Sequence, residues 1–209
     1  MRILIADDHA ILRDGLINSL TRAFPEAEFG EAGSSSAILP LIRNEKWDLV
    51  ILDINLPGRN GLEVLKDIKE CNPEIPVVIL SMYPEDQFAI RSIKAGASAY
   101  ITKDTAFPEL INAIRTIIEK KQYITSSIAS LLTSEIRGNT SKQLHETLSD
   151  REFQVFKMIA SGKTISIIAN ELSLSVKTIS VYRTNILQKM NLKNNAEIIF
   201  YAFKNNLTE

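Results

Sequence analysis

The sequence predicts two domains: an α/β domain of five βα units over residues 1–120 and a small all-α domain at the C-terminal end. In the first, short apolar runs alternate with amphipathic stretches, as is typical of a parallel sheet with helices on both faces. After residue 148, apolar residues keep helical spacing and no strand-like alternation occurs. Right-handed crossovers between parallel strands would place a site at the carboxyl ends of those strands.

Each element of the first domain is predicted from its own stretch of sequence. Five short runs are expected to form strands: residues 2–6, 27–31, 49–53, 77–80 and 99–102. Between them apolar residues recur every three or four positions, which predicts helices over residues 11–24, 37–43, 61–71, 87–94 and 107–119.

The periodicity weakens after residue 120, where Ser, Thr, Gly and Asn accumulate. This composition predicts a linker that contains one helix near residues 127–136. Ser149 then has the features of a helix N-cap, and Glu152 three residues later completes a capping box. We therefore expect domains at 1–120 and 148–209, joined by a linker at 121–147.

Composition narrows the class of protein. The net charge of −1 combines −4 for residues 1–148 (16 Lys and Arg against 20 Asp and Glu) with +3 for residues 149–209 (8 against 5). A basic C-terminal segment is expected of a nucleic-acid binder, but an ordinary solvated surface has it too. The apolar runs are far shorter than a membrane span, and the N-terminus turns acidic too early for a signal peptide. We expect a cytoplasmic protein without membrane contact.

Cysteine and histidine are scarce. Cys71 is the single cysteine, so no disulfide can form within the chain. His9 and His145 are the only histidines, which excludes a zinc finger. We interpret His9 as a residue at the start of a helix rather than as a metal ligand.

Acidic residues stand at the predicted ends of two strands. Asp7 and Asp8 end the first strand and Asp53 ends the third, so three carboxylates should converge at one edge of the sheet. They would repel one another without a cation, and Mg²⁺ fits because it accepts carboxylates, keeps waters and takes phosphate oxygens. For a phosphoryl group, Lys103 after the fifth strand would supply positive charge and Ser81 after the fourth a hydroxyl.

With these residues the chain resembles the receiver domain of bacterial two-component response regulators, which has a flavodoxin-like (βα)5 fold. The resemblance rests on residues of the right type in family order and spacing. They are Asp7-Asp8, Asp53 in Leu52-Asp53-Ile54-Asn55-Leu56-Pro57-Gly58, Ser81 in Leu80-Ser81-Met82-Tyr83, Tyr100 and Lys103. Pro84, at the expected start of the fourth helix, and Asp104, where many receivers have proline, depart from the family pattern.

The resemblance implies a role for each of these residues. Asp53 would be the phosphoacceptor, and Ser81 and Lys103 would hold the phosphoryl oxygens. Tyr100 would be a switch that turns inward when the Ser81 hydroxyl moves toward the phosphate. The added phosphate, about −1.5 to −2 charge units, can shift a loop between two arrangements. The implied Mg²⁺ ligands are Asp53, Asp8, Asp7 through a water, and the backbone carbonyl of Asn55.

Residues 164–190 predict two helices joined by a tight turn at Ser173-Leu174-Ser175, with Ser175 capping the second helix. If that helix packs by its apolar side, it presents a polar stripe outward. The expected apolar side is Ile179, Tyr182, Ile186, Leu187 and Met190, and the stripe is Lys177, Ser180, Val181, Thr184 and Gln188.

Such a stripe suits a reader of the DNA major groove. Lys177 can reach bases or phosphate, Ser180 and Thr184 can form hydrogen bonds, and Val181 can pack on a thymine methyl. The remaining expected contacts are Thr178 and Gln188 on the same helix, and Arg183, Lys189 and Lys193, which would bind phosphates.

Over residues 148–204 the chain resembles the LuxR-type helix-turn-helix of the NarL/FixJ branch of response regulators. The matching segments are Leu148-Ser149-Asp150-Arg151-Glu152, Ile168-Ala169-Asn170-Glu171-Leu172 and Lys177-Thr178-Ile179-Ser180-Val181-Tyr182-Arg183. The two resemblances imply a transcription regulator, not an enzyme, whose binding to double-stranded DNA is controlled by phosphorylation of Asp53. A sensor histidine kinase or a small phosphodonor would phosphorylate it. Other implied partners are a second copy of the chain and, as a candidate, RNA polymerase.

Three alternatives remain open at this point. A haloacid-dehalogenase-like phosphatase also uses a strand-end aspartate with Mg²⁺, but it needs a second acid where this chain has Asn55. A nucleotide-binding domain would need a glycine-rich phosphate loop, and the sequence has none. The receiver could also be a passive dimerisation or ligand module. If phosphorylation does act, it could release the C-terminal domain or promote dimerisation.

Overall fold

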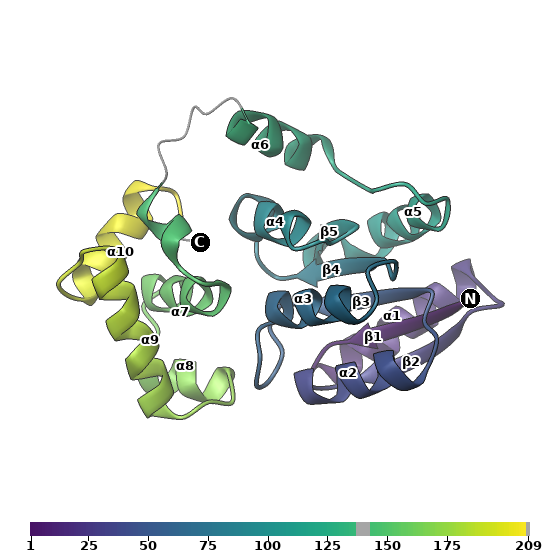
Figure 1. Ribbon diagram of the computed structural model, residues 1–209, viewed down its shortest axis with the longest axis horizontal. Coiled ribbons are helices and arrows are strands. Elements are labelled where there is room, and N and C mark those ends of the chain that lie inside the picture. Colours follow the sequence, from purple (N-terminus) through teal and green to yellow (C-terminus); the bar gives the residue numbers. More distant parts are fainter. Residues whose placement is uncertain (137–142, 208–209) are drawn as a thin grey trace. The chain divides into compact units, whose positions relative to one another are not determined.

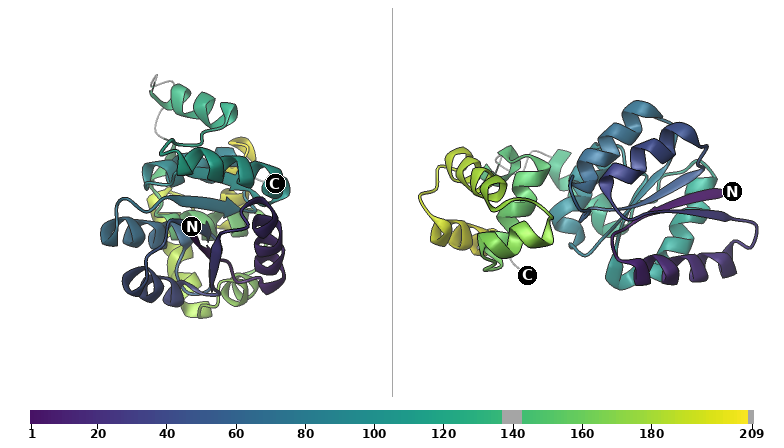
Figure 2. Two further views of the ribbon diagram at one scale, coloured as in Figure 1. Left: turned by 90° about the vertical axis from the view of Figure 1, so that its right-hand side faces the viewer. Right: turned by 90° about the horizontal axis from the view of Figure 1, so that it is seen from below.

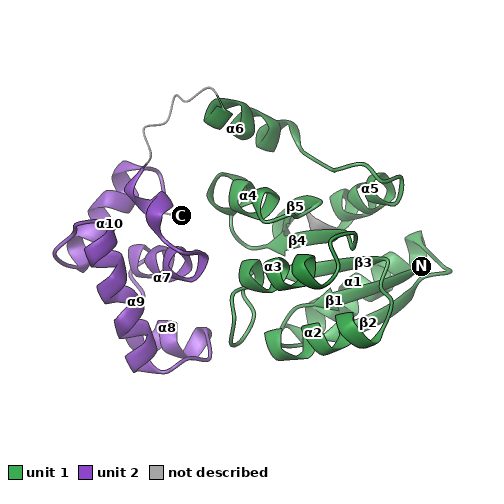
Figure 3. Cartoon of the chain, viewed as in Figure 1, with its two compact units in different colours: residues 1–137 green, residues 138–209 purple. Residues whose placement is uncertain are grey.

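The computed structural model describes residues 1–136 and 143–207, and the chain divides into two compact units, residues 1–137 and 138–209 (Figure 3). Each unit is described separately. In the described parts of the chain, no helix combines the length and the apolar character needed to cross a bilayer.

The first unit is built on a five-stranded parallel sheet (Figure 1). Its strands are β1 (Arg2–Ala6), β2 (Glu28–Ala32), β3 (Leu49–Asp53), β4 (Val77–Ser81) and β5 (Ala99–Thr102). Their order is β2-β1-β3-β4-β5. The chain therefore adds β2 on one side of β1, and then adds β3, β4 and β5 in turn on the other side. The predicted parallel fold is confirmed, with the second strand one residue later than expected and the fourth extended to include Ser81.

Helices cover both faces of this sheet (Figure 2). They are α1 (Ala10–Ala23), α2 (Ser35–Asn44), α3 (Gly61–Cys71), α4 (Glu85–Lys94) and α5 (Ala106–Ile118), and the short 3₁₀ turn η1 (Lys103–Thr105) precedes α5. One core lies between the sheet and the pair α1 and α5. It joins Leu16 and Leu20 of α1 and Leu110 and Ile114 of α5 to alternate strand residues such as Ile51. The alternation follows from the two-residue period of a strand.

The loop between β3 and α3 is held close to the end of the sheet. Asn60 caps α3, because its side chain accepts a hydrogen bond of 2.8 Å from the backbone N–H of Leu62. A Cβ atom on Gly61 would lie 2.1 Å from the carbonyl oxygen of Asp53, so only glycine allows this close approach. The loop after Asp53 therefore has little freedom to move away from the acidic edge.

A sixth helix, α6 (Ser126–Ile136), packs along α4 in the same unit. Its Ile128 is fully buried. The Thr125 hydroxyl donates a 3.0 Å hydrogen bond to Glu85, the first residue of α4, and Lys94, the last, pairs with Glu135. Polar contacts thus join α6 to both ends of α4. The sequence predicted a helix near residues 127–136 but gave no indication of its packing.

The second unit is entirely helical in the part that the structure describes. It contains the 3₁₀ turn η2 (Leu144–Thr147) and helices α7 (Asp150–Ala160), α8 (Ile165–Glu171), α9 (Val176–Lys189) and α10 (Asn195–Lys204). The predicted capping box of Ser149 and Glu152 is present at α7, and Ser175 caps α9 through the N–H of Thr178. Ser173, in the turn between α8 and α9, has a φ of 53°.

Candidate functional site

The acidic edge of the sheet gathers the side chains that the sequence indicated. Lys103 reaches in from η1, and its Nζ lies 2.7 Å from Asp7 Oδ2 and 2.7 Å from Asp53 Oδ2. Asp7 and Asp53 are almost fully buried, with side-chain exposures of 2% and 1%. One ammonium thus faces two buried carboxylates, and Asp8 adds a third, partly exposed one. The site carries excess negative charge.

Burial and charge shift the pKa values of these groups. Burial raises the pKa of the Asp53 carboxyl above its ordinary value, and the charge of Asp7 acts in the same direction, while Lys103 opposes both. Burial lowers the pKa of Lys103, but the attraction of Asp53 and Asp7 outweighs it, so the pKa lies above its ordinary value. Lys103 therefore stays charged at neutral pH. A second cation would relieve the remaining repulsion between the carboxylates.

The donor set fits a hard divalent cation such as Mg²⁺. Ligand atoms of Asp7, Asp8, His9 and Asp53 all lie within 4.8 Å of one another. Asp7 Oδ2 is buried and lies 2.7 Å from Lys103 Nζ, an ammonium that it shares with Asp53. With three carboxylates around one ammonium, a divalent cation would balance the remaining negative charge. The backbone N–H of Asn55 donates to Asp53 Oδ1 at 3.1 Å, which places Asn55 beside the same carboxylate.

The predicted switch residues lie at the ends of β4 and β5. Ser81 is fully buried, and its Oγ accepts a 3.1 Å hydrogen bond from the N–H of Tyr83. The Tyr100 ring is also fully buried, so it already has an inward position, and its hydroxyl donates to the Tyr83 carbonyl at 2.7 Å. Burial raises the pKa of Tyr100 above its ordinary value, which keeps this donor protonated. The peptide bonds of the described residues, including Lys103–Asp104, are trans.

Two neighbours of the acidic loop make contacts with it that the sequence did not indicate. Arg13, on α1, donates from Nη1 to the Asp7 carbonyl and from Nε to Glu31, both at 2.7 Å. It therefore ties the end of β1 to β2. His9 is the N-cap residue of α1, as expected, but its side chain makes no capping hydrogen bond and instead lies against the two carboxylates. For Arg13 the one sequence signal was its position, a cation in the first turn of the helix that follows the acidic pair.

The second unit presents the predicted stripe on the surface of α9. Its five residues are all exposed: Lys177, Ser180, Val181, Thr184 and Gln188. On the opposite side, Ile179, Ile186 and Met190 are fully buried, whereas Tyr182 and Leu187 are only partly buried. The hydroxyls of Ser180 and Thr184 donate to carbonyl oxygens of α9 itself, at 2.9 and 3.0 Å. Each hydroxyl oxygen can still accept a further hydrogen bond.

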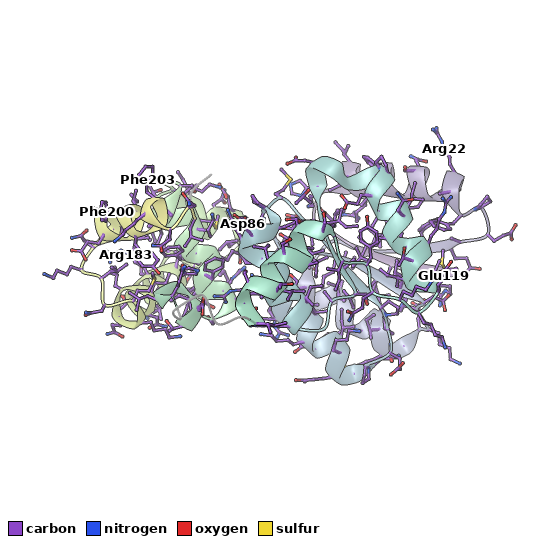
Figure 4. The ribbon with its side chains drawn as sticks, turned by 90° about the horizontal axis from the view of Figure 1, so that it is seen from above. Arg22, Asp86, Glu119, Arg183, Phe200 and Phe203 are labelled. Carbon is purple, nitrogen blue, oxygen red and sulfur yellow. The ribbon has the colours of Figure 1, made fainter. Side chains whose placement is uncertain are left out.

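The flanking cations of α9 are already engaged within the unit. Arg183 donates from Nε to Asn195 Oδ1 at 2.6 Å (Figure 4 labels Arg183), and Lys189 Nζ lies 2.6 Å from Glu152 Oε2. Thr178 shares a 2.7 Å hydrogen bond with Ser175. The Lys189 contact joins the end of α9 to the capping box of α7. This link was also missed, because 37 residues separate its two partners.

Comparison with known proteins gives matches to both units. Residues 3–115 match the family described as the response regulator receiver domain, and residues 146–202 match bacterial regulatory proteins of the luxR family. The chain is 31% identical to response regulator GacA of Pseudomonas protegens, over 100% of this chain and 98% of that protein. It is 32% identical to the oxygen regulatory protein NreC of Staphylococcus carnosus, over the full length of both.

Solved structures match the chain over nearly its whole length. The RcsB response regulator of Salmonella typhimurium matches with a TM-score of 0.59 and 25% identity, over 98% of both chains. RcsB of Salmonella enterica serovar Typhimurium, bound to promoter P1flhDC in the presence of phosphomimetic BeF₃⁻, matches with a TM-score of 0.60 and 25% identity, over 96% and 97% of the chains. The chain therefore belongs to the two-component response regulators that join a receiver domain to a LuxR-family helix-turn-helix domain.

Proposed function

We propose that Asp53 accepts a phosphoryl group and that this controls binding of α9 to double-stranded DNA, and hence transcription. The observation that carries the proposal is the arrangement of Asp53, Asp7 and Lys103, with Lys103 Nζ 2.7 Å from both buried carboxylates. The donor is a sensor histidine kinase or a small phosphodonor. Asn55 stands where a haloacid-dehalogenase-like phosphatase needs its second acid, and family membership favours a regulator over a hydrolase.

The reaction transfers a phosphoryl group from an oxygen or nitrogen atom of the donor to the Asp53 carboxylate. An Asp53 oxygen attacks the donor phosphorus, the bond to the donor's imidazole or acyl oxygen breaks with its electron pair, and an acyl phosphate forms. Lys103 neutralises charge on the transferred group and then holds one of its oxygens. The metal would be bound by Asp53, Asp8, Asp7 through water and the Asn55 carbonyl, and would supply further charge neutralisation.

Phosphorylation of Asp53 acts on the rest of the receiver domain through β4 and α4. A phosphoryl oxygen draws the Ser81 hydroxyl away from the N–H of Tyr83, a hydrogen bond of 3.1 Å in this structure. Tyr83 also accepts the hydrogen bond from Tyr100, so the two switch residues act on the same short segment. That segment leads directly into α4, and α4 is joined to α6 at both ends. The phosphoacceptor is thereby connected to α6, the helix that lies within the segment assigned to the linker.

We assign the phosphoacceptor domain to residues 1–120, the linker to 121–147 and the DNA-binding domain to 148–209. In the last, Lys177, Ser180, Val181, Thr184 and Gln188 read the major groove, and Thr178 and Arg183 support that contact. Lys189 contributes to phosphate binding while its pairing with Glu152 fixes the end of the reading helix. The exposed position of the five-residue stripe supports this assignment.

The DNA-bound form is a homodimer. One neighbouring structure contains two RcsB dimers bound to two parallel DNAs. In this chain α10 carries the exposed apolar residues Phe200 and Phe203, with exposures of 69% and 72%, and both are labelled in Figure 4. Exposed aromatic side chains on one helix suit contact with a second copy.

We place the protein in the cytoplasm and keep RNA polymerase as a further partner.

The test compares phosphorylation with DNA binding. Wild type and Asp53→Asn are incubated with Mg²⁺ and acetyl phosphate, and intact mass spectrometry looks for an acid-labile gain of about 80 Da, the mass of one phosphoryl group. Fluorescence anisotropy with DNA fragments selected for binding, and light scattering for dimer formation, follow in the same samples. We expect the adduct and tighter DNA binding in wild type alone. Equal affinity in every state refutes control by phosphorylation.

A further inference from the structure

The polar stripe of α9 contains two hydroxyl groups whose hydrogen atoms are already used. Ser180 Oγ donates to the carbonyl of Val176 at 2.9 Å, and Thr184 Oγ1 donates to the carbonyl of Ser180 at 3.0 Å. Both side chains are exposed. A hydroxyl has one hydrogen and two lone pairs, so each of these oxygens is left as an acceptor. The middle of the stripe therefore accepts hydrogen bonds from a ligand and donates none.

An acceptor of this kind discriminates between bases in the major groove. Guanine presents only acceptors there, N7 and O6, and is read most often by arginine or lysine. The stripe has one cation, Lys177, at its N-terminal end, and Arg183 beside it already donates from Nε to Asn195 at 2.6 Å. Amino hydrogens are offered only by adenine N6 and cytosine N4. The middle of the stripe thus matches adenine or cytosine, and not guanine.

Val181 distinguishes between these two bases. Its side chain is 52% exposed and stands in the stripe between the two hydroxyl residues. Thymine carries a methyl group at C5 that an apolar side chain can contact, whereas a G·C pair has no methyl group in the major groove. In an A·T pair the adenine amino group and the thymine methyl lie on the same groove edge. An A·T pair therefore suits both the hydroxyl oxygens and the valine, and a G·C pair suits only the oxygens.

We propose that Ser180, Val181 and Thr184 select A·T base pairs at the centre of the site that α9 contacts. The hydroxyl oxygens accept hydrogen bonds from adenine N6, and the valine packs on the thymine methyl. The inference rests on the DNA binding by α9 proposed above and adds a base preference to it.

The experiment removes one group at a time from the DNA and from the protein. The full chain, treated with Mg²⁺ and acetyl phosphate, first selects duplexes from a random library. Fluorescence anisotropy then compares the selected duplex with two kinds of analogue. Deoxyuridine in place of one thymidine lacks only the methyl group, and unsubstituted purine in place of one adenine lacks only the amino group. Val181→Ala and Thr184→Val remove the protein groups. Thr116→Val is the matched control, because Thr116 donates to the Asn112 carbonyl at the same 3.0 Å but lies on α5.

We expect A·T pairs at the centre of the selected site. There, deoxyuridine should weaken binding of wild type by about three- to fivefold, the effect of one buried methyl group. Purine should weaken it by about three- to tenfold, the effect of one hydrogen bond. Val181→Ala should lose the first sensitivity and Thr184→Val should reduce the second, while Thr116→Val keeps both.

Three outcomes would overturn the inference and leave DNA binding intact: G·C pairs at the centre, affinities that neither analogue changes, or equal sensitivity to deoxyuridine in wild type and Val181→Ala. If wild type selects no sequence at all, specific DNA binding by α9 is itself refuted.

Discussion

The contact between Glu152 and Lys189 offers a quantitative test of how the reading helix is held. Glu152 Oε2 accepts hydrogen bonds from the N–H of Ser149 at 2.9 Å and from Lys189 Nζ at 2.6 Å. The first closes the capping box of α7, and the second anchors the end of α9. Glu152→Ala removes both interactions. Glu152→Gln keeps a neutral acceptor for the cap but removes the charge that attracts Lys189.

The expected loss of stability follows from these two interactions. The lost hydrogen bond from the Ser149 N–H costs about 1 kcal/mol, while Ser149 itself still caps α7. The ion pair adds about 0.5–1 kcal/mol, near the upper end for surface pairs, since the Lys189 side chain is 44% exposed. We expect about 1.5–2 kcal/mol for Glu152→Ala and about 0.5–1 kcal/mol for Glu152→Gln. For a domain of this size, 1 kcal/mol corresponds to a fall in Tm of about 4–8 °C.

The assay is differential scanning calorimetry of the full chain, following the transition of the C-terminal domain. Glu171→Gln is the matched control, because it breaks an ion pair of the same length, 2.6 Å to Lys163, that lies outside any capping box. A double-mutant cycle of Glu152→Gln and Lys189→Met isolates the pair. If the two changes are additive within about 0.3 kcal/mol, the pair does not hold α9, and the reasoning fails.

The same pair predicts how stability depends on pH. Burial tends to raise the pKa of Glu152, but hydrogen bonds from Lys189 and Ser149 outweigh it, so the pKa lies below its ordinary value. A carboxyl with a lowered pKa in the folded state stabilises the fold above its unfolded pKa, about 4.3, and loses this contribution as pH falls through the folded value. The Tm difference between wild type and Glu152→Gln should therefore be full at neutral pH and shrink below about pH 4.3.

Lys103→Met should slow phosphorylation by acetyl phosphate by about 10²–10³-fold, because it removes one preorganised charge from the reacting group; a time course of intact mass measures this, and an unchanged rate contradicts the role of Lys103. Arg13→Met should raise the Mg²⁺ concentration for half-maximal phosphorylation, since the Asp7 loop loses its support, whereas an unchanged value would leave Arg13 purely structural. Lys177→Ala should weaken DNA binding by about 1–2 kcal/mol and, if Lys177 binds phosphate, lower the salt slope by about 0.9. Anisotropy at several salt concentrations tests it, and equal affinities would remove Lys177 from the interface.

The sheet and the acidic site were predictable because their signals are local. Apolar runs fixed the strands, and strand ends brought Asp7 and Asp53 to one edge. The shift of the second strand to Glu28–Ala32 is not local, since its register is set by pairing of Glu28 with Arg2 in β1. Gly30 in that strand has a tertiary reason too: a Cβ there would lie 2.2 Å from the Trp47 ring.

Two of the missed contacts join parts of the chain that are distant in sequence. Arg13 of α1 reaches Glu31 of β2, 18 residues away, and Lys189 meets Glu152 because α9 packs on α7. Neither side chain departs from an ordinary helix pattern. Periodicity shows which side of a helix is buried, but it does not show which helix lies against it.

The contacts between α6 and α4 determine at which residue this receiver can be joined to a different DNA-binding domain. A chimera that keeps residues 1–120 and takes the rest from another regulator would lose Ile128, which is fully buried in the native protein, together with Thr125 and Glu135. A junction after residue 136 keeps the receiver together with α6. Receivers exchanged at that later point should keep their response when given a new DNA-binding half, and those exchanged at the earlier one should lose it.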